Sequence, residues 1–352
     1  MDILEAKSKL DIHISKQRTH MYKPIQIAEL LMVHRLGIED IDLNDPNTYR
    51  SPSKRWRNNV TMRLIGRVST SSARYQDNLF EDNAVPPRVL VELAKENKDN
   101  DGVIESYIYH RFKERLGMVH NVNSYALSKT HKDFKLNEFL SIFHEQEGLR
   151  KSIDKIYEII VYSLFYTIIK YLDVEIRLNV KNYDSELMAD FQEFNNKVLG
   201  ISGESEGTEV KANIYRVGVT NAADKGLDMW SNFGPVIQVK HLSLTEQMTE
   251  EITESIKADQ IVIACKEAEE KIIESLLTQI GWREKIQGIV TEKDLIYWYD
   301  LCFTKYSDTL GRDLLENIRR EFSEEFPFTM EIDRFLKERG YSENQLVGMW
   351  SL

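Results

Sequence analysis

The sequence predicts an α/β protein: a mixed central sheet with helices on its faces, preceded by a mainly helical N-terminal region. Two observations support this fold class. In the first half of the 352 residues apolar side chains recur at helical spacing, and in the second half short strand-like runs alternate with amphipathic segments. Strands that alternate with helices favour a partly parallel sheet covered by helices.

The N-terminal half is expected to be helical apart from one break. Helical patterns cover residues 1 to about 40, 87–97, 103–116 and 153–176. Residues 44–54 are expected to form turns, because Pro46 and Pro52 break helices. The last helical segment has eleven uncharged residues between Glu158 and Lys170. A membrane span needs roughly 20, so we expect a buried helix in the core or at a subunit interface.

The second half supplies the expected sheet. In chain order the expected elements are a helix at 184–199, strands at 210–219, 227–230 and 235–242, a helix from Ser243 to about Lys257, a strand at 259–265, a helix at 267–280, a strand at 286–290 and a helix at 292–305. Ser243 with Glu246 three residues later predicts a capping box. The expected organisation is a helical region at 1–180, a core at 181–305 and a helical C-terminal extension at 306–352.

Composition limits the classes of function. The apolar content of 42% suits a globular core, and the net charge of -11 opposes nucleic-acid binding unless basic residues are concentrated somewhere. Cys265 and Cys302 cannot build a disulfide framework or a cysteine-rich zinc site. We expect two buried thiols and a cytoplasmic location, since the start of the chain lacks the apolar segment of a signal peptide.

Residues 226–242, GLDMWSNFGPVIQVKHL, carry the pattern on which the functional hypothesis depends. Asp228 begins one expected strand, and Gln238 and Lys240 lie two apart on the next, so both point to one face. A hairpin return would bring Asp228 beside them. Mg²⁺ prefers oxygen ligands, which the Asp228 carboxylate, the Gln238 amide and the Val239 carbonyl can supply. Lys240 would orient or deprotonate the attacking water and offset charge during phosphodiester hydrolysis.

The spacing of Asp228 and Gln-x-Lys resembles the PD-(D/E)xK nuclease superfamily in its D…QxK variant. This resemblance implies a restriction-endonuclease-like αβα core in which the three residues bind Mg²⁺. Position 238 is Gln where Asp or Glu is usual, which leaves the metal short of one negative charge. A further acid is therefore expected, with Glu193 as first choice and Glu209 as second.

A longer stretch carries a closer resemblance. Residues 214–244, IYRVGVTNAADKGLDMWSNFGPVIQVKHLSL, together with YKPIQIAELL at 22–31, resemble the HaeII-type family of type II restriction endonucleases. The resemblance implies a homodimer that cuts a short palindromic DNA site with Mg²⁺, and recognition of a GCGC-centred hexamer. Under it, residues 1–180 would serve DNA recognition and dimerisation, and residues 181–305 would be the catalytic core.

Residues 50–76 hold seven basic side chains and no acid, in a chain that is acidic as a whole. Basic side chains neutralise phosphates and release counterions, and arginine can also bind guanine in the major groove. The expected DNA-binding residues are Lys54, Arg55, Arg57, Arg63, Arg67 and Arg74. A solvated basic face, or a patch that docks on an acidic part of the same protein, is the alternative interpretation.

Other functions stay open or are disfavoured by the sequence. An Mrr-like or repair nuclease of looser specificity, and a non-catalytic DNA-binding protein that keeps the nuclease fold, are the alternatives. The sequence has no GxxxxGK[ST] motif and no HExxH motif, so neither a nucleotide cofactor nor a zinc hydrolase site is expected.

Overall fold

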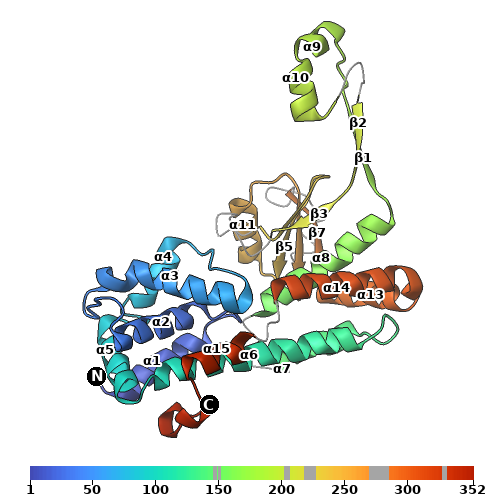
Figure 1. Ribbon diagram of the computed structural model, residues 1–352. Helices are drawn as coiled ribbons and strands as arrows, with labels where there is room; N and C mark the ends of the chain where they lie inside the picture. The colour runs from blue at the N-terminus through green and yellow to red at the C-terminus, as the bar shows by residue number, and fades with distance from the viewer. Residues whose placement is uncertain (146–148, 150–151, 202–206, 218–226, 269–284, 327–330) are drawn as a thin grey trace. The chain divides into compact units, whose positions relative to one another are not determined.

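The computed structural model describes residues 1–352 except 146–148, 150–151, 202–206, 218–226, 269–284 and 327–330 (Figure 1). The described residues form two compact units. The first comprises Met1–Ile159 and Leu315–Leu352, and the second comprises Ile160–Val217 and Gly226–Leu314. This division differs from the expected boundaries at 180 and 305, because the C-terminal residues join the N-terminal unit. Phe335, Leu336 and Trp350 are buried in the same apolar cluster as the N-terminal helices.

The first unit is helical. Its elements are α1 (Ile3–Ser15), α2 (Tyr22–Leu36), α3 (Pro46–Ile65), α4 (Ala73–Asp77), α5 (Pro87–Asp99), α6 (Val103–Ser128), α7 (Leu136–Glu145) and α15 (Glu331–Arg339). Two further helices, α8 (Ile153–Tyr171) and α14 (Arg312–Glu325), contribute residues to both units. Helix α2 is enclosed by the others, because every residue from Lys23 to Val33 is buried. The helices expected in this half are therefore present.

The expected turn at 44–54 is wrong, since most of it belongs to α3. Asp45 caps the helix by accepting a hydrogen bond from the Asn47 backbone N–H, and Pro46 occupies the first turn, where a missing N–H costs nothing. Pro52 lies inside the helix. Tyr49 and Ser53 on either side of it are buried, so tertiary packing holds the helix together across the proline.

The second unit contains the sheet. Its strands are β3 (Ile214–Arg216), β4 (Met229–Ser231), β5 (Val236–Lys240), β6 (Ile261–Cys265) and β7 (Ile286–Thr291), in that spatial order. The first two pairings are antiparallel, and the pairings of β5 with β6 and of β6 with β7 are parallel. A separate antiparallel pair, β1 (Glu175–Asn179) and β2 (Gly207–Lys211), frames α9 (Ser185–Asp190) and α10 (Gln192–Phe194) (Figure 1).

Helices follow β5 and β7, as expected. Helix α11 (Glu246–Ser255) packs Ile252 against Ile261 and Ile263 of β6. Its cap is Thr245, which accepts a hydrogen bond from the Met248 N–H, so the capping box predicted at Ser243 is wrong by two residues. Helix α13 (Glu292–Phe303) begins with a capping box after β7. The helix expected at 267–280 lies largely outside the described residues.

The prediction of an α/β protein with a mixed sheet is confirmed at this level. Both cysteines are buried thiols, also as expected. Among the described helices, none combines the length and the apolarity that crossing a bilayer requires.

Candidate active site

The hairpin of β4 and β5 brings together the polar residues that the sequence singled out. Its register pairs Met229 with Ile237 and Trp230 with Val236. Continued by one residue, this register places Asp228 opposite Gln238, so the two side chains share a face of the sheet. The connecting turn is closed by Ser231, whose hydroxyl donates to the Pro235 carbonyl at 2.7 Å.

The Asp228 carboxylate is held by two donors from β5. The Gln238 side-chain N–H donates to Asp228 Oδ2 at 2.6 Å, and the Val239 backbone N–H donates to the same oxygen at 2.8 Å. The Asp228 carbonyl in turn accepts a bond from the Val217 N–H at 2.8 Å, just after β3. Both the backbone and the side chain of Asp228 are therefore fixed by neighbouring strands, which suits a residue that must present its carboxylate in one position.

Lys240 is the last residue of β5 and lies two positions beyond Gln238, on the same face. Lys240 is the diagonal neighbour of Asp228 across the antiparallel pair, and such neighbours are roughly 7–8 Å apart. Its side chain is half-buried, and within the part of the chain that the structure describes it has no ion pair. The three side chains thus lie on one face, with the ammonium at the carboxyl end of a buried parallel strand.

The oxygen atoms of this hairpin suit a hard divalent cation. The Asp228 carboxylate and the Gln238 amide carry oxygen donors, and the Val239 carbonyl points to the same strand edge as its N–H, toward Asp228. Mg²⁺ is typically bound by one or two carboxylates and keeps several waters. Among the described residues, no group of three or more His, Cys, Asp or Glu side chains is placed to hold a metal ion. Of the three hairpin residues Asp228, Gln238 and Val239, the first is the acid, and the other two supply neutral oxygens.

The structure does not bring the two expected additional acids to this hairpin. Glu193, on α10, is 86% exposed and pairs with Lys197 at 2.7 Å. Glu209, on β2, pairs with Arg177 at 2.8 Å. Both carboxylates thus have cationic partners on neighbouring elements, so a role for either at Asp228 stays a prediction.

An aromatic pair on the Asp228 face was missed by the sequence analysis. Tyr215 and Trp230 are cross-strand partners on β3 and β4, with ring centroids 4.2 Å apart. They remain 36% and 43% exposed. Trp230 lies two residues from Asp228, so strand alternation places both side chains on the same face. The same two-residue spacing in the sequence could have identified Trp230 as a neighbour of the site.

A family model for the HaeII restriction endonuclease matches residues 6–341. The chain belongs to the HaeII restriction endonuclease family. It is 48% identical to the type II restriction enzyme HaeII of Haemophilus aegyptius, over 97% of this chain and 98% of that protein. It is also 48% identical to the type II restriction enzyme NgoBI of Neisseria gonorrhoeae, over 96% of each chain. No solved structure matches this chain.

The family match confirms the predicted identification as a type II restriction endonuclease. The assignment of site residues in this HaeII-family protein is based on the geometry of the β4–β5 hairpin. The match spans nearly the whole chain, so it includes both the Asp228 hairpin and the basic stretch at 50–76.

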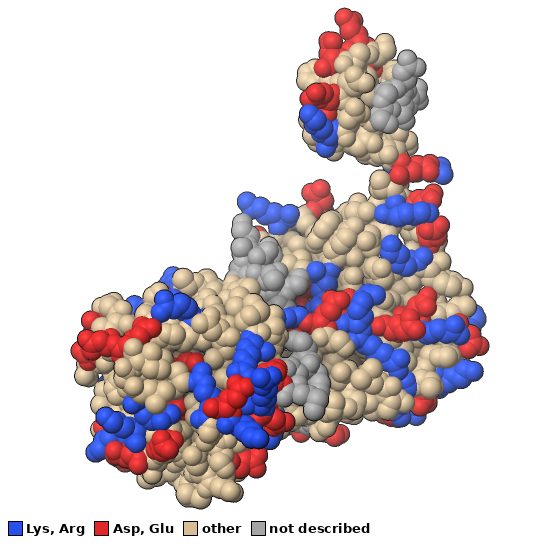
Figure 2. Space-filling view, viewed as in Figure 1, with Lys and Arg blue, Asp and Glu red and all other residues tan. Residues whose placement is uncertain are grey.

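Three of the seven basic residues in the stretch at 50–76 of the HaeII-family chain form ion pairs with acids outside the stretch. Lys54 pairs with Asp77 at 2.5 Å and Arg55 with Glu39 at 3.2 Å. Arg63 pairs with both Glu331 and Glu338 of the C-terminal segment, at 3.1 and 2.7 Å. On the face shown in Figure 2, Lys and Arg side chains lie among Asp and Glu side chains.

Arg57 differs most from the expectation of a DNA contact, because it is only 1% exposed. Its guanidinium donates to Gln26 at 2.8 Å and to Gln76 at 2.8 Å, which ties α2 to α4. Burial lowers the pKa of Arg57 to about 10. We therefore interpret Arg57 as a structural residue. Arg74 is exposed and Arg67 is half-buried, so their contact with DNA stays a prediction.

Proposed function

We propose that this protein is a Mg²⁺-dependent type II restriction endonuclease whose cutting site is the β4–β5 hairpin. The observation that carries the proposal is the double hydrogen bond that fixes the Asp228 carboxylate beside Gln238, with Lys240 on the same face. The mixed sheet, with helices after β5 and β7, is compatible with a restriction-endonuclease-like αβα core.

The hairpin residues have distinct roles in this proposal. Asp228, the Gln238 amide oxygen and the Val239 carbonyl would hold Mg²⁺. The bound ion lowers the pKa of water and stabilises negative charge on the phosphate. Gln238 keeps the Asp228 carboxylate in place through its N–H. The Lys240 ammonium orients the attacking water and offsets charge as the phosphodiester bond breaks. Tyr215 and Trp230 present ring surface to the sugars of the bound strand.

The substrate is proposed to be a short palindrome in duplex DNA, centred on GCGC. A palindrome has two-fold symmetry, and a homodimer with one cutting site per subunit matches it and cuts both strands. The two curated relatives are named type II restriction enzymes over nearly the same length of chain, which supports this substrate class.

Digestion of long duplex DNA tests the proposal directly. The pure protein with Mg²⁺ should give discrete fragments, and sequencing their ends should return one palindrome. A smear of fragments would instead identify a nuclease of looser specificity, such as an Mrr-like enzyme.

The Lys240→Ala variant tests the cutting site. It should lose at least 100-fold in cleavage rate while its DNA affinity stays within about twofold, because one electrostatic group in an active site contributes on the order of 10²-fold or more. Lys257→Ala, an exposed lysine just after α11, is the matched control. Full cleavage by Lys240→Ala would show that this hairpin is not the cutting site. If the wild type and Lys240→Ala bind DNA equally and the wild type does not cleave it, the protein is a non-catalytic DNA-binding protein.

A further inference from the structure

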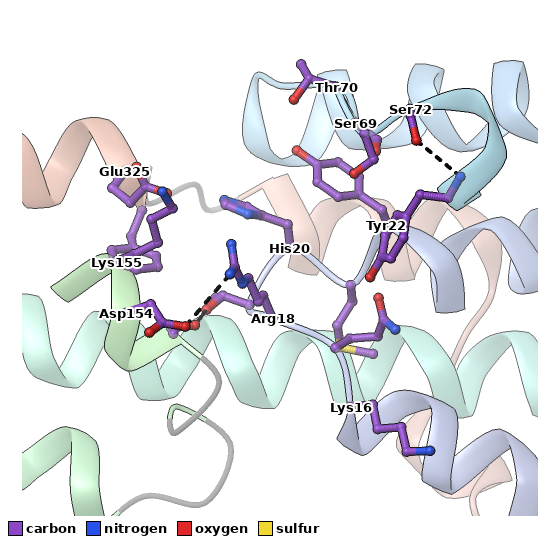
Figure 3. A pocket seen from close by; sticks show the side chains of 17 residues that line it. Lys16, Arg18, His20, Tyr22, Ser69, Thr70, Ser72, Asp154, Lys155 and Glu325 are labelled. Atoms are coloured by element: carbon purple, nitrogen blue, oxygen red, sulfur yellow. Dashed lines mark hydrogen bonds and ion pairs between the residues drawn. The ribbon is translucent and has the colours of Figure 1, made fainter. Parts of the chain in front are cut away.

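The first unit contains a polar pocket with a volume of about 610 Å³. It is lined by the segment between α1 and α2, the segment before α4, the start of α8 and the end of α14. In Figure 3, Asp154, Lys155 and Glu325 lie on one side, Ser69 and Ser72 on the other, and His20 between them. Sites for small molecules in proteins have volumes of roughly 300–1,000 Å³, so the size suits a small ligand.

Two buried polar atoms in the wall of the pocket have no hydrogen-bond partner among the described residues: His20 Nε2 and the Tyr22 hydroxyl. Buried polar groups in folded proteins are nearly always paired, because an unpaired one keeps its full desolvation penalty. The two rings stack on each other with centroids 5.6 Å apart, so both polar atoms belong to one aromatic wall.

His20 is a hydrogen-bond acceptor in this pocket. Burial is the main cause that lowers its pKa to about 4, so the imidazole is neutral at physiological pH. A backbone hydrogen bond with Glu325 engages the ring as well. Since a carbonyl can only accept, the ring N–H is used there, and Nε2 keeps a lone pair for a ligand that carries an N–H or O–H donor.

The charge around this wall is positive. Arg67 and Arg57 both act electrostatically on Tyr22, and Arg67 Nη1 is a further buried atom without a partner among the described residues. Lys16 and Arg18 also line the pocket. Acids offset part of this charge. Glu325 lines the pocket and acts electrostatically on His20 and Tyr22. Arg18 lies 3.9 Å from Asp154, and Lys155 pairs with Glu158 at 2.6 Å. The remaining excess favours a ligand with a negative group.

We propose that this pocket binds a nucleotide, with the base against His20 and Tyr22 and the phosphate toward Lys16 and Arg18. The edges of bases carry N–H groups that can donate to His20 Nε2 and acceptors for the Tyr22 hydroxyl. The faces of bases stack on aromatic rings. A bare phosphate fits less well, because its oxygens would meet the lone pair of Nε2. The hydroxyl groups of Ser69 and Ser72, which also line the pocket, add further donors.

The nucleotide has two conceivable sources. One is a nucleotide of the DNA substrate that has swung out of the duplex, as happens in proteins that bind a base outside the helix stack. The other is a free mononucleotide. The first source rests on the proposed endonuclease function, and the second does not.

Tyr22→Phe tests the pocket because it removes only the hydroxyl. A buried hydroxyl without a partner contributes nothing to folding, so the melting temperature should stay the same or rise. Loss of one hydrogen bond to a ligand should weaken nucleotide or DNA binding about 3- to 10-fold. Tyr157→Phe is the matched control, since the Tyr157 hydroxyl is also buried without a partner among the described residues but does not line the pocket.

Two probes distinguish the sources. The first is a duplex that carries 2-aminopurine at each position of the cut sequence in turn, bound with Ca²⁺ in place of Mg²⁺. The second is each of the four deoxynucleoside monophosphates, titrated calorimetrically. A rise in 2-aminopurine fluorescence that Tyr22→Phe weakens and Tyr157→Phe does not would assign the pocket to a displaced nucleotide. Monophosphate binding with the same pattern, without the rise, would assign it to a free nucleotide.

Either result supports the proposal. It is overturned if Tyr22→Phe equals the wild type with both probes, or if the wild type binds neither the monophosphates nor an unstacked base. If the wild type cleaves DNA but gives such a negative result, nucleotide binding in the pocket is rejected and the proposed endonuclease function is unaffected. Absence of cleavage would reject the endonuclease function, while the monophosphate titration would still decide the pocket.

Discussion

At the scale of single residues, hydrogen bonding decides which polar groups remain available for chemistry. Asp228 and Gln238 face each other across the hairpin, and the amide N–H of Gln238 supplies a donor that a carboxylate at this position could not. The usual acid of this motif would place two negative groups 2.6 Å apart unless a cation lay between them. Gln238 therefore lets the hairpin stay ordered without metal, and in the proposed metal site it contributes one negative charge fewer than an acid would.

The Gln238→Glu variant tests whether order without metal is gained in return for a lost negative charge. Without divalent metal, its free energy of unfolding should fall by about 1–3 kcal/mol, because a charge-assisted bond is replaced by repulsion in a mostly buried position. Mg²⁺ should raise its melting temperature more than that of the wild type. Gln260→Glu, at an exposed position before β6, controls for the added charge. An equal response to Mg²⁺ in both variants would contradict a metal site at Asp228.

His20 should make stability depend on pH. Its pKa is about 4 when folded, through burial and despite Glu325, and about 6.5 when unfolded, so the unfolded chain binds more protons between these values. Stability should therefore fall as the pH drops from 6.5 toward 4. Between pH 7.5 and pH 5 this residue should account for about 2 kcal/mol. Urea unfolding of wild type and His20→Phe at both pH values measures the difference. If both proteins lose the same stability between pH 7.5 and pH 5, His20 is not the cause.

At the scale of elements, tertiary contacts override local preferences. Glu105 of α6 is buried and accepts a bidentate pair from Arg35 of α2 at 2.9 Å. Asn97 of α5 and the Tyr341 hydroxyl each donate to it at 2.6 Å. One buried carboxylate thus links three helices and the C-terminal segment, and removing Arg35 would leave a buried charge without its ion-pair partner. This network explains why the C-terminal residues belong to the first unit.

Helix α3 offers a test of the same principle. Pro52 lacks the N–H that would complete the helix ladder, so Pro52→Ala should stabilise the protein by about 1–3 kcal/mol. Pro46→Ala, in the first turn of the same helix, should change stability by less than about 0.5 kcal/mol, because that N–H has no helical acceptor. Thermal unfolding compares the two. A destabilising Pro52→Ala would show that the proline ring itself is needed for packing.

At the scale of the whole molecule, the proposed palindromic substrate requires two cutting sites. Each chain has one Asp228–Gln238–Lys240 hairpin, so cutting both strands in one event needs a second copy. Sedimentation equilibrium of the protein bound to its DNA site, with Ca²⁺, should give the mass of two chains per duplex.

Mixed dimers test the division of labour between the two copies. A dimer with one wild-type and one Lys240→Ala subunit, purified through two different tags, should nick supercoiled plasmid and accumulate the open circle. Wild-type dimers should give linear DNA. Linear product from the mixed dimer at the wild-type rate would mean that one subunit can cut both strands, and the one-site-per-strand arrangement would be wrong.

The sequence alone determined the α/β class, the order of most elements and the hairpin that joins Asp228 to Gln238 and Lys240. These features follow from local rules: strand alternation, turn residues and the spacing of a short hairpin. Only the tertiary structure decided that Pro52 lies within a helix, that Arg57 is buried and that Arg63 pairs with the C-terminal segment. It also revealed the pocket around His20. These outcomes depend on partners distant in the sequence, and no local pattern specifies which partner a side chain meets.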